Sequence, residues 1–207
     1  MKRLEALQSV VALFNDVPCF VTVGRAWPEW DGLRPGDGNF NLKTLGSGSS
    51  VGLGLALALP HRRIAVLDGD GAVTMNVNGL LTVGRMQPKN LIHMVFDNKI
   101  YESSGSIRTA TAYNLDLVKL ASAAGIRNAC RVNTVEGFKV AVEKSFGTDG
   151  PHFILAEVES AGKATSPAYA RVDEVDGKFR FIRFLEALEG RKLWEDAISV
   201  KQSIRQA

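Results

Sequence analysis

Residues 64–71, IAVLDGDG, carry the clearest structural signal in this sequence. Four apolar residues, Ile64–Leu67, run directly into the acidic, glycine-rich group Asp68–Gly71. A short apolar run bounded by turn residues predicts a buried strand that ends in a loop. Two carboxylates therefore follow one strand end, and this is where we first look for chemistry.

On both sides of this segment, apolar runs of strand length alternate with segments of helical spacing. This alternation predicts an α/β fold, a doubly wound parallel sheet with helices on both faces, with ligands at the carboxyl ends of the strands. The predicted strands are Cys19–Val23, Ile64–Leu67, Leu91–Phe96, Arg127–Val132 and Phe153–Val158. The predicted helices are 1–14, Val51–Leu59, Val73–Met86, a helix capped by Asn114 that ends near Ala124, and Val135–Phe146 capped by Thr134, whereas Pro28–Asn41 is predicted to be a long loop.

The composition is that of a globular protein, with 45% apolar and 23% charged residues in a chain of 207. We expect one domain over 1–207, with a charged helical extension from about residue 170. Basic residues are dispersed, so no nucleic-acid partner is expected. The longest apolar run, Val51–Leu59, is too short to span a membrane, and we expect a cytoplasmic protein. Cys19 and Cys130 have apolar neighbours and are predicted to be reduced core thiols.

Asp97 and Asn98 form a second polar strand end, after the next predicted strand. Neighbouring parallel strands lie about 4.8 Å apart, so Asp70 and Asn98 could share one ion. Mg²⁺ needs about six oxygen ligands and takes some of them from phosphates and water. The glycines on either side of Asp70 allow a phosphate to approach the backbone closely. The residues themselves thus predict a magnesium site in which the metal binds a phosphate.

The turn Gly69-Asp70-Gly71, twenty-five residues before Asp97-Asn98, resembles the GDG…NN motif of thiamine-diphosphate (ThDP) enzymes. The resemblance implies the ThDP-binding fold and two cofactors, ThDP and Mg²⁺, with the metal bridging to the diphosphate. In this chain Asp replaces the first Asn of the pair, and Ile100 stands where the family often has glycine. The implied metal ligands are Asp70, Asn98 and the main-chain carbonyl of Ile100, and Gly69, Gly71 and Ala72 are implied to contact the cofactor.

Two further segments resemble the sulfopyruvate and phosphonopyruvate decarboxylases. Thr44-Leu45-Gly46, followed by SSVGLG at 49–54, is similar to the family's S-M-G…SSIGLG, and DNKIYESSGSIRT at 97–109 is similar to its DN..HESTGGQ.T. In that family the residue at the position of Leu45 wedges under the cofactor and bends it into a V. The resemblance implies that the catalytic residues are Leu45, Ser103 and Ser104 and that the cofactor contacts are Thr44, Leu45, Gly46 and Tyr101. The serines could equally be plain loop residues, and Tyr101 could equally be a packing residue.

The resemblance also implies a partner. ThDP activation needs a glutamate from a pyrimidine-binding domain, and no segment here matches that domain. We therefore expect a pyrimidine-binding subunit in a two-plus-two heterotetramer, and a lyase that decarboxylates a short anionic 2-oxo acid such as sulfopyruvate or phosphonopyruvate. Residues 22–29 and 105–107 depart from the family pattern where it meets the substrate. Arg25 or Arg108 could bind an anionic tail.

Other interpretations stay open. VLDGDG at 66–71 also matches the DxDG of haloacid-dehalogenase-like phosphatases, with Asp68 as nucleophile and Asp70 as acid/base. That family has the motif near its N-terminus and a late acidic pair on a strand end, whereas here 67 residues precede Asp68, and Asp173 and Asp176 lie in a polar segment. The glycines of 46–54 could form a dinucleotide loop, although helix packing also explains them. A ThDP-dependent carboligase subunit of the acetolactate-synthase type and a catalytically silent cofactor-binding subunit are further alternatives. His93 is predicted to be a core or interface residue rather than a catalyst.

Overall fold

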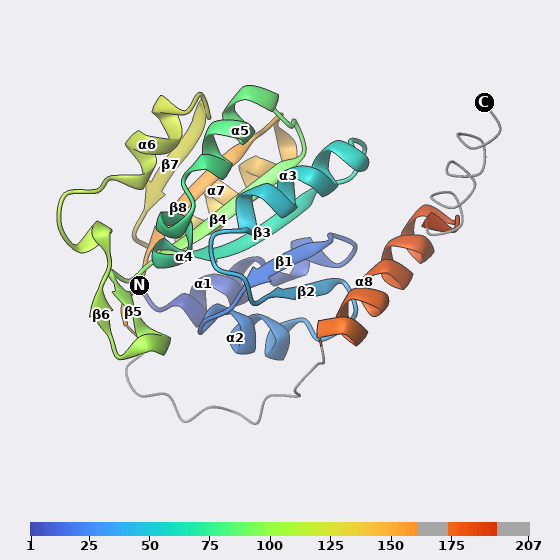
Figure 1. The fold of residues 1–207 in the computed structure, drawn as a ribbon, viewed down its shortest axis with the longest axis horizontal. Coiled ribbons are helices and arrows are strands. Elements are labelled where there is room, and N and C mark those ends of the chain that lie inside the picture. The colour runs from blue at the N-terminus through green and yellow to red at the C-terminus, as the bar shows by residue number, and fades with distance from the viewer. Residues whose placement is uncertain (161–173, 194–207) are drawn as a thin grey trace.

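The computed structural model describes residues 1–160 and 174–193, and its centre is a six-stranded parallel sheet (Figure 1). The strand order is β2-β1-β3-β4-β8-β7. The strands are β1 (Cys19–Thr22), β2 (Asn39–Leu42), β3 (Ile64–Gly69), β4 (Leu91–Asp97), β7 (Asn128–Val132) and β8 (His152–Glu157), and a separate antiparallel pair joins β5 (Ile100–Tyr101) to β6 (Ile107–Arg108).

Helices cover both faces of the sheet, which confirms the predicted doubly wound fold. Successive side chains of a strand point to opposite faces, so each strand contributes to two cores. Val21 and Leu67 belong to the core under α1 (Arg3–Val10), α2 (Ala26–Leu33) and α7 (Val135–Gly147). Phe20 and Val66 belong to the core under α3 (Gly48–Ala58), α5 (Asn78–Met86), α6 (Leu117–Ala123) and α8 (Glu174–Glu189). Shorter elements are η1 (Val11–Phe14), α4 (Asp70–Met75), η2 (Glu102–Ser104) and η3 (Ala110–Ala112).

The prediction of a loop over Pro28–Asn41 was wrong, because α2 and β2 occupy most of it. Pro28 falls in the first turn of α2, where a missing backbone N–H costs nothing. Trp30 is fully buried, and its Nε1 donates to Asn39 Oδ1 at 3.0 Å, which ties α2 to β2. Burial of the tryptophans outweighs the turn-forming composition of the segment.

Three smaller predictions also need correction. The segment Val73–Met86 is interrupted at residues 76–77, so it forms α4 and α5 instead of one helix. The cap of α6 is Asp116, not Asn114, because Asp116 Oδ1 accepts hydrogen bonds from two backbone N–H groups of the first turn. Cys130 is exposed on the edge strand β7, whereas Cys19 is buried as predicted, and burial raises its pKa to about 12.

The C-terminal extension predicted from about residue 170 lies partly outside the described residues, and its described part is α8. This helix packs on β2 through a cluster of aromatic rings. The ring centre of Phe181 lies 5.2 Å from that of Phe20 and 5.6 Å from that of Phe40. Within 1–160 and 174–193, none of the helices combines the length and the apolar character needed to cross a bilayer.

Candidate active site

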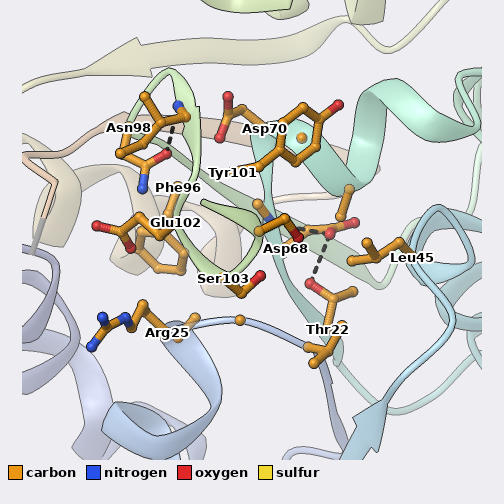
Figure 2. A pocket seen from close by; sticks show the side chains of 18 of the residues that line it. Thr22, Arg25, Leu45, Asp68, Asp70, Phe96, Asn98, Tyr101, Glu102 and Ser103 are labelled. Carbon is orange, nitrogen blue, oxygen red and sulfur yellow. Dashed lines mark hydrogen bonds between the residues drawn. The ribbon is translucent and has the colours of Figure 1, made fainter. Parts of the chain in front are cut away.

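An open cleft with about 580 Å³ of empty space lies at the carboxyl ends of β1, β3 and β4 (Figure 2). The sheet order reverses at β1, which has β2 on one side and β3 on the other. The connections that leave β1 and β3 diverge there, and α/β sheets bind ligands in such a crevice. The cleft is lined by residues 22–26 at the end of β1, residues 68–72 at the end of β3, and residues between 96 and 104 at the end of β4 and beyond it, together with Arg3 and Leu45.

Asp70 begins α4 and is only 2% exposed. Its Oδ2 accepts hydrogen bonds from Thr109 Oγ1 at 2.5 Å and from Thr111 Oγ1 at 2.9 Å. Burial is the main cause that raises the pKa of the Asp70 carboxyl to about 6. The hydrogen bond from Thr109 lowers this pKa, and the negative charge of Asp97 raises it further. A buried carboxylate of this kind is stabilised by a nearby cation, so Asp70 has the electrostatic setting of a metal ligand.

Asn98 lies at the same end of the cleft as Asp70, as Figure 2 shows. Two side chains build the turn that places it there: Asp97 Oδ1 accepts from Lys99 N, and Asn98 Oδ1 accepts from Ile100 N, both at 3.1 Å. Lys99 adopts a φ of 65°, so the left-handed residue of this turn precedes Ile100 and no glycine is needed at position 100. The three predicted metal ligands, Asp70, Asn98 and Ile100, all line the cleft.

Leu45 enters the cleft from the loop between β2 and α3, opposite Asn98 in Figure 2. Gly46 shapes this loop, because its φ is 82° and a Cβ there would lie 2.8 Å from Asn76 Cβ. Asn76 Nδ2 also donates to the Gly46 carbonyl at 3.1 Å, which anchors the loop to the break between α4 and α5. Leu45 is thereby held half-buried in the cleft. Thr44 and Gly46, both predicted cofactor contacts, are not among the residues that line it.

Tyr101 packs its ring directly on Gly71. A Cβ at position 71 would lie 2.3 Å from Tyr101 Cε1, so only glycine fits under the ring. The Tyr101 hydroxyl lies 3.4 Å from Thr74 Oγ1. Of the two roles predicted for Tyr101, packing is the one that these contacts support, and the ring also lines the cleft beside Gly69, Gly71 and Ala72.

Asp68 is a buried structural carboxylate, 1% exposed. Its Oδ1 accepts hydrogen bonds from Thr22 Oγ1 at 2.8 Å and from Gly69 N at 3.0 Å, and its Oδ2 lies 3.2 Å from His93 Nε2. These contacts tie the ends of β1 and β3 to the middle of β4. His93 is a buried residue of the sheet, as predicted, and its partner Asp68 is a contact that the sequence pattern did not reveal.

The structure gives the phosphatase interpretation no support, because both oxygens of Asp68 are engaged by contacts within the sheet. The late acids give it no support, since Asp176 forms an ion pair with Arg180 on α8 and Asp173 lies outside the described residues. For the glycines of 46–54, the structure supports the helix-packing interpretation at Gly52, where a Cβ would lie 2.4 Å from Val66 Cγ2. This glycine serves the packing of α3 on β3.

Arg3 is a site residue that the sequence analysis missed. It is 6% exposed, lines the cleft, and donates to Glu29 through Nε at 2.7 Å and Nη2 at 3.0 Å. Its Nη1 lies 3.7 Å from Glu102, which also accepts a hydrogen bond from Ser160 Oγ at 2.9 Å. The first helix is therefore bound to the segment that carries Ser103. No sequence signal identifies Arg3, because its partners come from distant segments.

The predicted serines and arginines divide into two groups. Ser103, Ser104 and Arg25 line the cleft, with Arg25 at its edge on the side of Glu102 in Figure 2. Arg108 is exposed on β6 and is not among the lining residues. Of the two arginines considered for an anionic tail, only Arg25 has the required position.

The ligand chemistry at the Asp70 end of the cleft fits Mg²⁺ with a diphosphate. The protein offers one carboxylate and one amide side chain there, both with oxygen donors. Among residues 1–160 and 174–193, no three His, Cys, Asp or Glu side chains converge to hold a metal by themselves. Mg²⁺ retains phosphate and water ligands in most sites, so two side chains and a main-chain carbonyl are a sufficient protein share.

Comparisons with known proteins give the family. Residues 36–156 match the model "Thiamine pyrophosphate enzyme, C-terminal TPP binding domain". The chain is 32% identical to the sulfopyruvate decarboxylase subunit beta of Methanothermobacter thermautotrophicus, over 92% of this chain and 97% of that one. It is 36% identical to the phosphonopyruvate decarboxylase of Streptomyces viridochromogenes over 73% of this chain, but it spans only 38% of that protein's length.

The solved structures support the fold. A thiamin diphosphate-dependent enzyme from Mycobacterium smegmatis superposes with a TM-score of 0.67 at 15% identity, over 77% of this chain and 32% of that one. Benzoylformate decarboxylase from Polynucleobacter necessarius gives 0.56 at 20% identity, over 75% and 32%. The family match includes the strand ends that carry Asp70 and Asn98. The chain therefore belongs to the thiamine-diphosphate enzymes and contains their C-terminal TPP-binding domain.

Proposed function

We propose that this chain is the ThDP- and Mg²⁺-binding subunit of a heteromeric 2-oxo acid decarboxylase. The observation that carries the proposal is the cleft, where Asp70 and Asn98 lie at one end and Leu45 at the other. Two oxygen donors at one end would suit Mg²⁺ with a diphosphate, and an apolar side chain at the other end would suit the organic part of the cofactor. Relatives that are named decarboxylases match most of the chain, which supports the reaction type.

The roles of the chain's own residues follow from their positions. Asp70, Asn98 and the carbonyl of Ile100 would hold Mg²⁺, and the backbone of residues 69–72 would lie against the diphosphate. Leu45 would fix the shape of the cofactor, because its loop is anchored through Gly46 to Asn76. ThDP, when bound, supplies the electron sink that permits loss of CO₂ from a 2-oxo acid. Ser103 and Ser104 line the cleft and offer hydroxyl groups to the substrate.

A partner subunit follows from the same proposal. Among residues 1–160 and 174–193, Glu102 is the one glutamate that lines the cleft, and Arg3 and Ser160 already engage it. The glutamate that ThDP activation requires would therefore come from a pyrimidine-binding subunit, in a two-plus-two assembly. The name of the relative from Methanothermobacter, a subunit beta that matches nearly end to end, supports this division. Cytoplasmic location stays a prediction.

For the substrate we propose a short 2-oxo acid with an anionic tail, such as sulfopyruvate or phosphonopyruvate. The support is the names of the relatives and the place of Arg25 at the edge of the cleft. A guanidinium group matches the oxygens of a sulfonate or phosphonate with two parallel hydrogen bonds. A carboligase is the second candidate, because an acetolactate synthase large subunit from Escherichia coli is 26% identical over 57% of this chain.

The experiment is a substrate panel on the chain isolated with its partner. Sulfopyruvate, phosphonopyruvate, pyruvate, a branched 2-oxo acid and benzoylformate are compared by CO₂ release and by aldehyde formation. We expect preference for the anionic acids, and a clear preference for the neutral-tailed acids would remove that part of the proposal. Acyloin formation without free aldehyde would replace decarboxylase by carboligase. If the purified chain alone turns over at about 1 s⁻¹ or faster, an ordinary enzyme rate, the proposal of a split site is wrong.

A further inference from the structure

Two threonine hydroxyls hold the proposed metal ligand Asp70 by a single oxygen. Thr109 Oγ1 and Thr111 Oγ1 both contact Oδ2, at 2.5 Å and 2.9 Å, and neither contacts Oδ1. Thr109 is 1% exposed and Asp70 is 2% exposed, so water competes little for these bonds. A carboxylate held at one oxygen keeps a fixed plane, which leaves the direction of its other oxygen defined.

The same hydroxyls connect Asp70 to Asp97. Thr111 Oγ1 lies 2.8 Å from Asp97 Oδ1 and 2.9 Å from Thr109 Oγ1. Asp97 is 5% exposed and also accepts a hydrogen bond from Lys99 N in the turn that presents Asn98. The network therefore spans the ends of β3 and β4, and it joins the strand end that carries one proposed ligand to the turn that carries the other.

Counting donors shows that the network depends on the hydroxyls. Each threonine has one hydroxyl hydrogen, yet the two oxygens make four short contacts, three of them with carboxylates. Because only two hydrogens serve these four contacts, neither hydroxyl can take over the contacts of the other. Replacement of either threonine by an isosteric valine would leave a buried carboxylate oxygen with one donor fewer.

We propose that Thr109 and Thr111 are positioning residues that orient Asp70 toward the metal and keep its spacing to Asn98. This inference rests on the proposed function. Side chains that orient metal ligands in this way typically contribute roughly 10- to 100-fold to metal affinity. Neither threonine was a candidate in the sequence, because both follow the β5–β6 hairpin and reach Asp70 only when that hairpin folds back over the end of the sheet.

The test compares Thr109→Val and Thr111→Val with Thr109→Ser and Thr111→Ser. The matched control is Thr82→Val, which makes the same change at an exposed hydroxyl on α5, bonded only to its own helix at the Asn78 carbonyl. ThDP is titrated calorimetrically into the full chain, in the complex with which it is isolated, with saturating Mg²⁺ and again with chelator. Thermal unfolding of each variant establishes that it is folded.

We expect both valine variants to bind ThDP roughly 10- to 100-fold more weakly than the wild type in Mg²⁺, with the metal-free titration unchanged. The serine variants should recover most of the loss, and Thr82→Val should match the wild type. Wild-type affinity in folded valine variants would overturn the inference, and so would equal losses for valine and serine, because packing and not the hydroxyl would then be the cause. If the wild type itself shows no Mg²⁺-dependent binding of ThDP, the proposed function fails, and this separate result identifies that failure.

Discussion

The buried pair of Asp68 and His93 gives the sharpest prediction about stability. We consider His93→Phe, because it keeps an aromatic ring at a position where His93 already packs edge-on against Phe153, with ring centres 5.4 Å apart. The change removes the partner 3.2 Å from Asp68 Oδ2, in a position where the carboxylate is 1% exposed. The larger ring also changes the packing, so the polar contact is separated from packing by combining this change with Asp68→Asn.

The magnitude follows from what remains around Asp68. Removing one hydrogen-bond partner from a buried carboxylate typically costs about 1.5–3 kcal/mol. Asp68 Oδ1 keeps its bonds from Thr22 Oγ1 and Gly69 N, so we expect the lower end of that range. A loss of about 1.5 kcal/mol reduces the folding equilibrium constant roughly tenfold. In a protein of ordinary stability this loss is large and easily measured.

Urea unfolding of the chain is the assay, with His61→Phe as the matched control at an exposed histidine. Asp68→Asn should partly rescue His93→Phe, because an amide in place of the carboxylate leaves no charge without its partner; the double-mutant cycle measures this coupling. A loss below about 1 kcal/mol for His93→Phe, or strictly additive effects of the two substitutions, would refute the reasoning.

The remaining predictions concern the cleft. Gly71→Ala places a Cβ 2.3 Å from the Tyr101 ring, so this ring must move and ThDP binding should weaken at least tenfold in calorimetry, whereas Gly54→Ala, which meets no atom within 4 Å, should bind normally. Leu45→Ala should reduce kcat of the assembled complex about 10²-fold with little effect on ThDP affinity, because a misplaced cofactor loses reactivity before binding; equal losses in kcat and affinity would contradict this role. Because the pKa of Asp70 is about 6 and a metal ligand must be deprotonated, Mg²⁺-dependent ThDP affinity should fall about tenfold for each pH unit below 6, and Asp70→Asn should remove that dependence. Without metal, pH acts on stability in the opposite direction, because the folded state binds the Asp70 proton more tightly than the unfolded state does. The free energy of unfolding should therefore fall as pH rises from about 4 to 6, by at most about 3 kcal/mol, and thermal scans across that range measure the change.

The sheet and the positions of the two proposed ligands could be predicted because both depend on local sequence. Alternating apolar runs set the strands, and the strand-end turns at Asp70 and Asn98 have a characteristic spacing. The segment 28–41 misled the prediction because its glycines and prolines suggest a loop, while the burial of Trp30 that makes α2 stable depends on the rest of the fold.

The residues that surround the proposed ligands could not be predicted in the same way. Thr109 and Thr111 reach Asp70 from the segment that follows the β5–β6 hairpin. Arg3 and Glu102 are in contact although they lie far apart in the sequence. Such contacts depend on how distant segments pack, which no local pattern encodes. Roles within the cleft, for Leu45 and the serines, rest on the family resemblance and on their position together.

The most direct test of the central claim is a calorimetric titration of ThDP into the assembled complex, with Mg²⁺ and with chelator, for the wild type, Asp70→Ala and the surface control Asp176→Ala. Asp70 is buried in the cleft, whereas Asp176 lies on α8 beside Arg180. We expect binding that requires Mg²⁺, is lost in Asp70→Ala and is retained in Asp176→Ala. Tight binding of ThDP that survives both Asp70→Ala and removal of the metal would contradict it.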